Sequence, residues 1–278
     1  MQILGVVGHS DSGKTTAIEA LVSRLAPSRK VATIKHMTHQ ANIDQAGKDT
    51  FRHRAAGSSA TYGITEDGDW FATGETADLH DILTHLSTTF DVCLLEGFSQ
   101  ARLPSIVLGN IEYDGPIVDR FSHGVDVDFD AVVAHIDTLE PFVTLESLVS
   151  QIKESPQADR AGAIATFTGR VRTKDTIDDV PTEYLEFEYY EGVADKRLTQ
   201  ITTELEEREG VYKVLLHHRQ GIIQQGQDIV FVVVLAGHRE EAFRTVEDGI
   251  NRLKAEVPIF KKEVTVEEEF WVHDRAEI

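Results

Sequence analysis

The sequence has almost no cysteine: Cys93 is the one thiol among 278 residues. One cysteine cannot form a disulfide within the chain, and its place in an apolar run predicts a buried thiol. No apolar stretch approaches the roughly 18 residues that a transmembrane helix needs, and the apolar N-terminal stretch has no basic flank. We therefore expect a cytoplasmic protein with no signal peptide and no membrane contact.

Positive charge is scarce as well. Lys and Arg total 27 against 47 Asp and Glu, so the formal net charge is −20 at pH 7, and both halves of the chain share it. Nucleic-acid binding requires a basic surface, so we expect no nucleic-acid partner. Acidic residues spread this evenly suit a halophile protein, in which salt screens the charge repulsion, but equally an ordinary acidic protein. Unfolding in dilute buffer would identify the salt-adapted case.

The rest of the composition is that of a globular protein, with 41% hydrophobic and 27% charged residues. A chain of 278 residues has room for one large domain or two ordinary ones. Thr144 can cap the start of a helix with an apolar face. This helix ends in the polar segment 154–159, where Pro156 stops it. This segment is the best linker in the chain. We place an N-terminal domain at residues 1–154 and a C-terminal domain at residues 159–278.

The strongest motif is G-H-S-D-S-G-K-T at residues 8–15, which has the G-x-x-x-x-G-K-T pattern of a phosphate-binding P-loop. An apolar strand pattern precedes it, and a helix is predicted from Lys14 to about Ala26. The glycines let the backbone turn tightly and point its N–H groups at phosphate oxygens. Lys14 would hold the phosphates and Thr15 would ligate Mg²⁺. A glycine-rich turn that matches by chance is the weaker alternative. The predicted nucleotide-binding residues of the loop are Gly8, Ser12, Gly13, Lys14, Thr15 and Thr16.

Polar residues also follow two other predicted strands of the first half. Glu96 ends the apolar run 90–95, where P-loop NTPases hold Mg²⁺ or its water, so Glu96 is a candidate metal residue together with Thr15. His36 and His39 follow the strand 30–34, but no second Cys/His cluster completes a zinc site beside them. No N-K-x-D-like segment marks guanine recognition, so these residues do not determine the base.

Four segments in this order resemble the molybdopterin-guanine dinucleotide biosynthesis protein B family: G-H-S-D-S-G-K-T-T at 8–16, K-H-M-T-H at 35–39, D-T-F-R-H-R-A-A-G at 49–57 and L-L-E-G-F at 94–98. The resemblance covers about residues 1–154. It implies an α/β P-loop NTPase domain with a mainly parallel sheet, which binds GTP with Mg²⁺ and hydrolyses GTP weakly. It also implies an accessory role beside the guanylyltransferase that attaches GMP to molybdopterin. The implied site-lining residues are Lys35, His36, His39 and Asp49; Ser99 departs from a lysine that the family often has.

The second half has a different pattern. Strands are predicted at 162–172, 184–190, 211–216 and 229–235, with helices at 191–209 and 240–254. Two helices against a mainly antiparallel sheet predict an α+β domain. If the few cations of this acidic domain converge, they form a pocket for an anionic substrate, although each alone is more often an ordinary surface residue. These cations are Arg170, Arg172, His238, Arg239, Lys254, Lys261 and Lys262.

Five segments of this half resemble the large catalytic subunit of molybdopterin synthase: G-A-I-A-T-F-T-G-R-V-R at 162–172, L-E-F-E-Y-Y at 185–190, H-H-R-Q-G at 217–221, G-H-R-E-E-A-F at 237–243 and L-K-A-E-V-P-I-F-K-K-E at 253–263. In that family, sulfur passes from the thiocarboxylated C-terminus of a ubiquitin-like small subunit to cyclic pyranopterin monophosphate. The resemblance implies that Lys254 and Lys261 are catalytic, and it implies no tightly bound cofactor in this domain. The implied substrate-binding residues are Phe167, Arg172, His238 and Arg239, with Lys262 grouped beside them.

The two resemblances also imply a homodimer, because both families form dimers and a neighbouring subunit completes the pockets of the synthase. A different interpretation is a P-loop GTPase of the metallochaperone kind with a non-catalytic docking domain for the ubiquitin-like partner. The pair Lys254 and Lys261 favours the enzyme, since a docking platform has no need of it. The sequence also shows no metal-binding Cys/His cluster that a metallochaperone would use.

Overall fold

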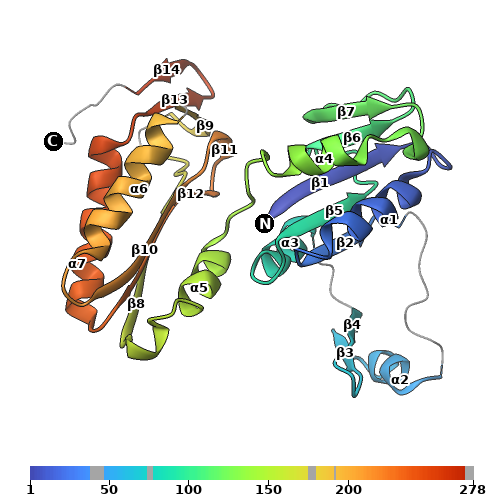
Figure 1. Ribbon diagram of the computed structural model, residues 1–278, viewed down its shortest axis with the longest axis horizontal. Helices are drawn as coiled ribbons and strands as arrows, with labels where there is room; N and C mark the ends of the chain where they lie inside the picture. Colours follow the sequence, from blue (N-terminus) through green and yellow to red (C-terminus); the bar gives the residue numbers. More distant parts are fainter. Residues whose placement is uncertain (38–46, 74–77, 175–179, 191, 273–278) are drawn as a thin grey trace. The chain divides into compact units, whose positions relative to one another are not determined.

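The computed structural model describes residues 1–37, 47–73, 78–174, 180–190 and 192–272 (Figure 1). The chain folds into two units, Met1–Phe142 and Val143–Ile278. Each unit encloses its own hydrophobic core.

Five parallel strands form the sheet of the N-terminal unit, in the order β2-β5-β1-β6-β7. Because both faces of the central strands are covered, β1 and β5 read as continuous apolar runs. The sheet confirms the predicted α/β class. Its strands are β1 (Gln2–Gly8), β2 (Val31–Lys35), β5 (Val92–Glu96), β6 (Ser105–Leu108) and β7 (Ile117–Phe121).

Helices cover both faces of this sheet (Figure 1). On one face α1 (Lys14–Leu25) and α4 (Phe129–Ile136) share a core with β1, and on the other α3 (Leu79–Ser87) packs over β5. Cys93 lies on the α3 face, and burial raises the pKa of its thiol to about 12. The predicted buried thiol is thus confirmed.

The same unit contains a small exposed substructure. The short helix α2 (Asp49–Ala55) has no buried residue, and β3 (Thr61–Ile64) pairs antiparallel with β4 (Trp70–Thr73). A short 3₁₀ helix, η1 (Gly124–Asp126), follows β7.

In the described part of the C-terminal unit, two antiparallel sheets pack with three α-helices, which confirms the predicted α+β class. One sheet has the order β10-β12-β8 and the other β11-β9-β13-β14. The elements are α5 (Leu145–Lys153), a 3₁₀ helix η2 (Ala158–Arg160), β8 (Ala163–Arg170), β9 (Thr182–Tyr189), α6 (Val193–Glu206), β10 (Val211–His218), β11 (Gly221–Gln224), β12 (Asp228–Ala236), α7 (Arg239–Glu256), β13 (Ile259–Thr265) and β14 (Glu269–Trp271).

The three-stranded sheet has a core on each face. Helices α6 and α7 cover one face, and α7 approaches closely because Gly249 has no side chain: a Cβ there would lie 3.1 Å from Val232. Helix α5 covers the opposite face. A smaller core that includes Phe187 and Ile223 belongs to the four-stranded sheet.

The boundary between the units lies between Phe142 and Val143, before the predicted linker at 154–159. In α5, Leu148 and Ile152 pack with Phe231 of β12, so this helix belongs to the C-terminal unit. Thr144 caps α5 as expected, and this cap lies at the start of the C-terminal unit, which begins at Val143. An amphipathic helix has the same sequence pattern whichever sheet it covers, and for this reason the sequence assigned it to the wrong side.

Candidate functional sites

The P-loop lies between β1, which ends at Gly8, and α1, which begins at Lys14. Asp11 and Gly13 both have left-handed backbones, with φ of 60° and 84°. A Cβ on Gly8 would lie 2.5 Å from the Ser12 Oγ, so the loop closes only around glycine. Lys14 Nζ donates to the carbonyl oxygen of Gly8 at 3.0 Å and to that of His9, which places the ammonium group over the loop.

Glu96 connects the P-loop to the neighbouring strands. Its Oε1 accepts a hydrogen bond from Thr15 Oγ1 at 3.0 Å and lies 2.8 Å from Lys35 Nζ, with the carboxylate side chain only 12% exposed. The contact follows from the topology, because β5 lies between β1 and β2 and all three strands end at the same edge. The structure therefore brings together Lys14, Thr15, Lys35 and Glu96 at one edge of the sheet.

These groups fit a magnesium-bound nucleotide. The Thr15 hydroxyl and the Glu96 carboxylate are oxygen donors of the kind that Mg²⁺ prefers. The left-handed turns at Asp11 and Gly13 are the kind of backbone that turns successive N–H groups inward as an anion nest. Ser12 Oγ is buried and has no hydrogen-bond partner among the described residues.

The remaining predicted residues of this site lie around this cluster or away from it. His36 follows β2, its backbone N–H donates to the Glu96 carbonyl at 2.9 Å, and its ring contacts that of Phe98. Thr16 is exposed in the first turn of α1. Asp49 begins α2 and pairs with Arg52 at 3.5 Å, and no described hydrogen bond or ion pair joins it to the P-loop. His39 lies outside the described residues.

Sequence reasoning missed one residue of this site, His123, which follows β7. Its Nε2 lies 3.1 Å from the carbonyl oxygen of Asp11, and its ring occupies the space where a Cβ on Gly13 would be. A lone histidine in a polar loop matches no sequence motif. The signal that could have revealed it is the strand β7 just before it, since a loop that follows a parallel strand lies at the same edge of the sheet as the P-loop.

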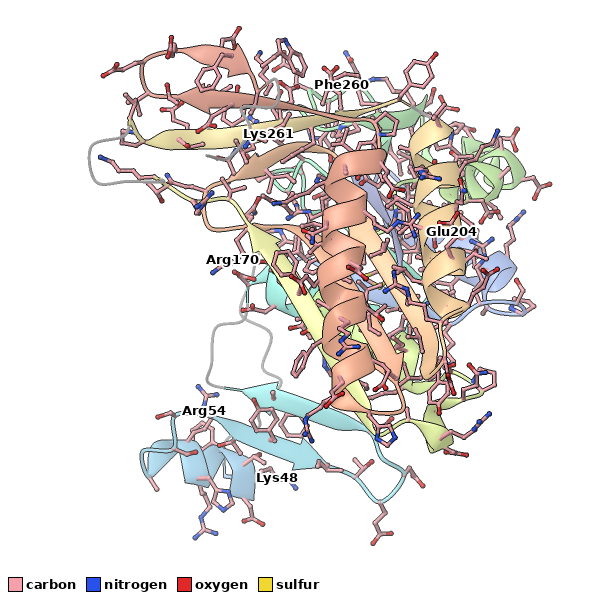
Figure 2. All side chains as sticks on the ribbon, turned by 90° about the vertical axis from the view of Figure 1, so that its left-hand side faces the viewer. Lys48, Arg54, Arg170, Glu204, Phe260 and Lys261 are labelled. Carbon is pink, nitrogen blue, oxygen red and sulfur yellow. The ribbon has the colours of Figure 1, made fainter. Side chains whose placement is uncertain are left out.

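In the C-terminal unit, Lys254 and Lys261 lie on consecutive elements. Lys254 is exposed in the last turn of α7. Lys261 is half-buried near the start of β13 (Figure 2). The short link through Pro258 therefore brings the two lysines to the same end of the unit. Lys261 lies directly opposite the buried Phe187 of β9.

Lys262 lies on the other face of β13. Side chains alternate along a strand, so Lys261 and Lys262 point to opposite sides of the sheet. Lys262 Nζ lies 2.8 Å from a Glu269 carboxylate oxygen and 3.9 Å from one of Glu186. The hydrogen bond with Glu269 raises the pKa of Lys262. The structure thus does not bring Lys262 together with Lys261, as a shared pocket would require.

Phe167 and Arg172 lie near the end of the unit that carries the lysines. Strand β8 begins at Ala163, which pairs with Ala236, the last residue of β12. Since α7 begins shortly after Ala236, the start of β8 and the start of α7 lie at the same end of the unit. Helix α7 packs over β8 and returns along it, so the C-terminal end of α7 reaches the C-terminal end of β8 (Figure 1). Phe167 is 36% exposed on β8, and Arg172 is exposed just beyond the strand.

His238 and Arg239 lie at the other end of α7. Both are exposed, and Arg239 is the first residue of the helix whose last turn carries Lys254. At roughly 1.5 Å per residue, about 22 Å of helix separates Arg239 from Lys254. One chain therefore does not bring all the predicted cations of the C-terminal site together.

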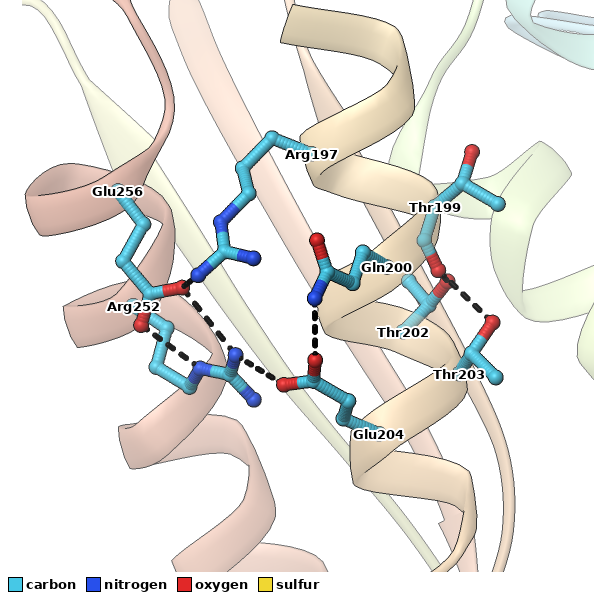
Figure 3. Close-up of polar contacts among 8 residues, drawn as sticks. All are labelled: Arg197, Thr199, Gln200, Thr202, Thr203, Glu204, Arg252 and Glu256. Atoms are coloured by element: carbon cyan, nitrogen blue, oxygen red, sulfur yellow. Dashed lines mark hydrogen bonds and ion pairs between the residues drawn. The ribbon is translucent and has the colours of Figure 1, made fainter.

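An ion-pair network ties the last turn of α7 to α6 (Figure 3). Arg252 donates to Glu256 at 2.9 Å and also to Glu204, while Arg197 donates to Glu256. The hydrogen bonds from Arg252 hold the pKa values of Glu204 and Glu256 below their usual range. The network fixes the turn that carries Lys254.

Buried His218 supports the sheet face of Lys261. Its ring packs edge-on against Phe187 with the centroids 4.7 Å apart, and its Nδ1 donates to the Arg219 carbonyl at 2.8 Å. Burial lowers the pKa of His218 to about 4, which outweighs the opposing effect of that hydrogen bond. His218 is therefore neutral at pH 7.

Two family models match the chain, one to each half. The model described as Molybdopterin guanine dinucleotide synthesis protein B matches residues 3–120, and the model described as MoaE protein matches residues 140–256. A probable molybdopterin synthase of Haloferax volcanii is 48% identical over 275 residues, which cover 99% of this chain and 100% of that protein. The chain belongs to the molybdopterin synthase family. Both resemblances seen in the sequence are confirmed.

Other members of the molybdopterin synthase family match part of the chain. The molybdopterin synthase catalytic subunit of Yersinia pestis is 40% identical over 119 residues, 43% of this chain and 78% of that protein. A crystal structure of molybdopterin synthase from Staphylococcus aureus is 36% identical and covers 49% of this chain and 94% of that one, with a TM-score of 0.43. The chain is thus an enzyme of molybdenum cofactor biosynthesis that carries a nucleotide-binding unit of the protein B type. No described helix is long and apolar enough to cross a membrane.

Proposed function

We propose that the C-terminal unit transfers sulfur from the thiocarboxylated C-terminus of a ubiquitin-like small subunit to cyclic pyranopterin monophosphate, with Lys254 and Lys261 as its catalytic residues. The observation that carries this proposal is the direct link from α7 to β13, which brings both lysines to one end of the unit. Phe167 and Arg172 lie near the same end. Because both reactants are anions, clustered cations reduce their repulsion and hold them together.

Lys261 has two possible roles in the transfer. In the first, the thiocarboxylate sulfur displaces an oxygen substituent of the pterin, which leaves as water or as a phosphate oxygen, and the Lys261 amine then attacks the acyl carbon of the resulting thioester. The acyl–sulfur bond breaks, the thiolate stays on the pterin, the amine proton passes to water, and water later hydrolyses the amide to the carboxylate and the free amine. In the second, Lys261 moves protons between the reactants. Lys254 holds the sulfur or the phosphate in both cases.

We propose further that the protein acts as a homodimer in which His238 and Arg239 of one copy complete the site of the other. Helix α7 holds these residues about 22 Å of helix away from Lys254 in its own chain. A second copy can supply them without any change in the fold.

The direct test of sulfur transfer combines the purified chain with the thiocarboxylated small subunit and the cyclic pterin, followed by an assay for molybdopterin. We expect product from the native chain and none from Lys261→Ala. The matched control is Lys196→Ala, which removes an exposed lysine from α6. Normal turnover by Lys261→Ala would contradict the assignment and favour a docking domain.

For the N-terminal unit we propose GTP binding with Mg²⁺, weak GTP hydrolysis, and assistance to the guanylyltransferase that forms the guanine dinucleotide cofactor. Lys14 and the loop N–H groups would hold the phosphates, while Thr15 and Glu96 would hold the metal. Bound Mg²⁺ neutralises phosphate charge. We expect Lys14→Ala to lose GTP affinity in calorimetric titration and to keep sulfur transfer; unchanged GTP affinity would contradict the P-loop assignment.

A further inference from the structure

The loop after β7 returns to the P-loop and contacts it at three consecutive residues. Gly124 N–H donates to the Ser12 carbonyl at 2.9 Å, and His123 Nε2 lies 3.1 Å from the Asp11 carbonyl oxygen. The 3₁₀ helix η1, which begins at Gly124, also packs against α1. The third contact is steric and involves Gly13.

The hydrogen bonds of His123 define its tautomer. The backbone N–H of Val125 donates to Nδ1 at 3.4 Å, so Nδ1 carries the lone pair. A carbonyl oxygen only accepts, so Nε2 must carry the hydrogen that it donates to Asp11. The ring thus has a partner on each nitrogen.

Both sides of this contact require glycine. A Cβ on Gly13 would lie 2.6 Å from His123 Cε1 and 2.9 Å from its Nδ1. A Cβ on Gly124 would lie 2.1 Å from the carbonyl oxygen of Gly13. The second glycine of the P-loop motif therefore leaves room for the histidine ring, in addition to allowing its own left-handed backbone.

The bonded P-loop residue is also the strained one. Asp11 has a left-handed backbone, which is unfavourable for a residue with a Cβ and persists only where the surroundings hold it. The hydrogen bonds from His123 and Gly124 fix the Asp11 and Ser12 carbonyl groups. A fixed carbonyl orients the rest of its peptide plane, including the next N–H group that would face a phosphate.

We propose that His123 and Gly124 hold the P-loop in its anion-binding conformation, which makes His123 a positioning residue for nucleotide phosphates. The inference rests on the proposed nucleotide binding. His123 acts on the phosphates through Asp11 and Gly13, and it has no part in binding the base of the nucleotide.

The test compares His123→Ala and His123→Gln with the native chain. The alanine variant should bind GTP and GDP about tenfold more weakly, the loss expected for one hydrogen bond, with guanosine affinity unchanged because guanosine has no phosphate. The glutamine variant should recover most of the affinity, since its amide N–H can reach the Asp11 carbonyl. Unchanged GTP affinity in His123→Ala, or an equal loss for guanosine, overturns the proposal.

Hydrogen exchange of the nucleotide-free chain separates this inference from GTP binding itself. Amide exchange in residues 9–16 should accelerate in His123→Ala and in Gly124→Ala, whose added Cβ meets the Gly13 carbonyl, and it should return towards native rates in His123→Gln. Native exchange rates in both alanine variants overturn the positioning role. If the native chain binds no GTP but the exchange changes as expected, the proposed function fails and the positioning role stands.

Discussion

In the N-terminal unit, Lys14, Thr15, Lys35 and Glu96 meet within one chain, whereas in the C-terminal unit α7 holds Arg239 far from Lys254. The difference follows from the two kinds of sheet. Parallel strands all end at one edge, so residues that follow different strands converge there. In the antiparallel sheets of the C-terminal unit neighbouring strands end at opposite edges, and α7 carries Arg239 and Lys254 at its two ends. We therefore expect one site that is complete in a single chain and one that needs two chains.

The largest expected effects come from removing the central lysine of each unit. Lys14→Ala should lower GTP affinity about a hundredfold or more and leave molybdopterin formation unchanged. Lys261→Ala should lower molybdopterin formation about a hundredfold or more and leave GTP affinity unchanged. Calorimetric titration with GTP and the molybdopterin assay measure the two activities in the same preparations. Loss of both activities in either variant would show that the two units do not act independently.

The next effect concerns stability against pH and belongs to the C-terminal unit. Folding lowers the pKa of His218 to about 4, below the ordinary value of 6.5, so the folded state favours the neutral ring. The contribution of the neutral ring to the free energy of unfolding is complete above pH 6.5. As the pH falls towards 4, up to about 3 kcal/mol of it is lost. Chemical denaturation of the native chain and of His218→Asn at pH 7 and pH 4.5 measures it. Equal pH slopes in the two proteins would contradict this role of His218.

A smaller effect is expected at Glu96, which holds the N-terminal site together. Glu96→Gln removes the negative charge that faces Lys35 and Thr15, so GTP affinity in the presence of Mg²⁺ should fall about tenfold. Affinity measured in EDTA should change much less, because the carboxylate then has no metal to hold. An equal loss with and without Mg²⁺ would show that Glu96 supports the loop and not the metal.

The smallest effect is expected from the ion pairs between α6 and α7. Arg252→Met should destabilise the unit by about 1 kcal/mol or less and lower molybdopterin formation several-fold, because the turn with Lys254 loosens. The matched control is Arg208→Met, since Arg208 pairs with Asp248 in the middle of α7. Equal losses of activity in the two variants would mean that the network stabilises the helices without positioning Lys254.

The sequence predicted features that depend on neighbours in the chain and missed those that depend on packing. The P-loop and Glu96 were found because a strand, a loop and a helix leave a local pattern. Strand β13 was missed because Pro258 and the charged K-K-E segment do not look like a strand, so the opposite directions of Lys261 and Lys262 were not seen. His123 reaches the P-loop only through the order of the parallel strands, which no local pattern encodes.

The division of the C-terminal site between two copies is tested most directly by mixing two inactive variants, Lys261→Ala and the double variant His238→Ala, Arg239→Ala. In a mixed dimer one site then combines the native Lys261 of one copy with the native His238 and Arg239 of the other. Random pairing of equal amounts should restore about a quarter of the native molybdopterin formation. No activity in the mixture, with each variant folded and dimeric, would contradict a shared site.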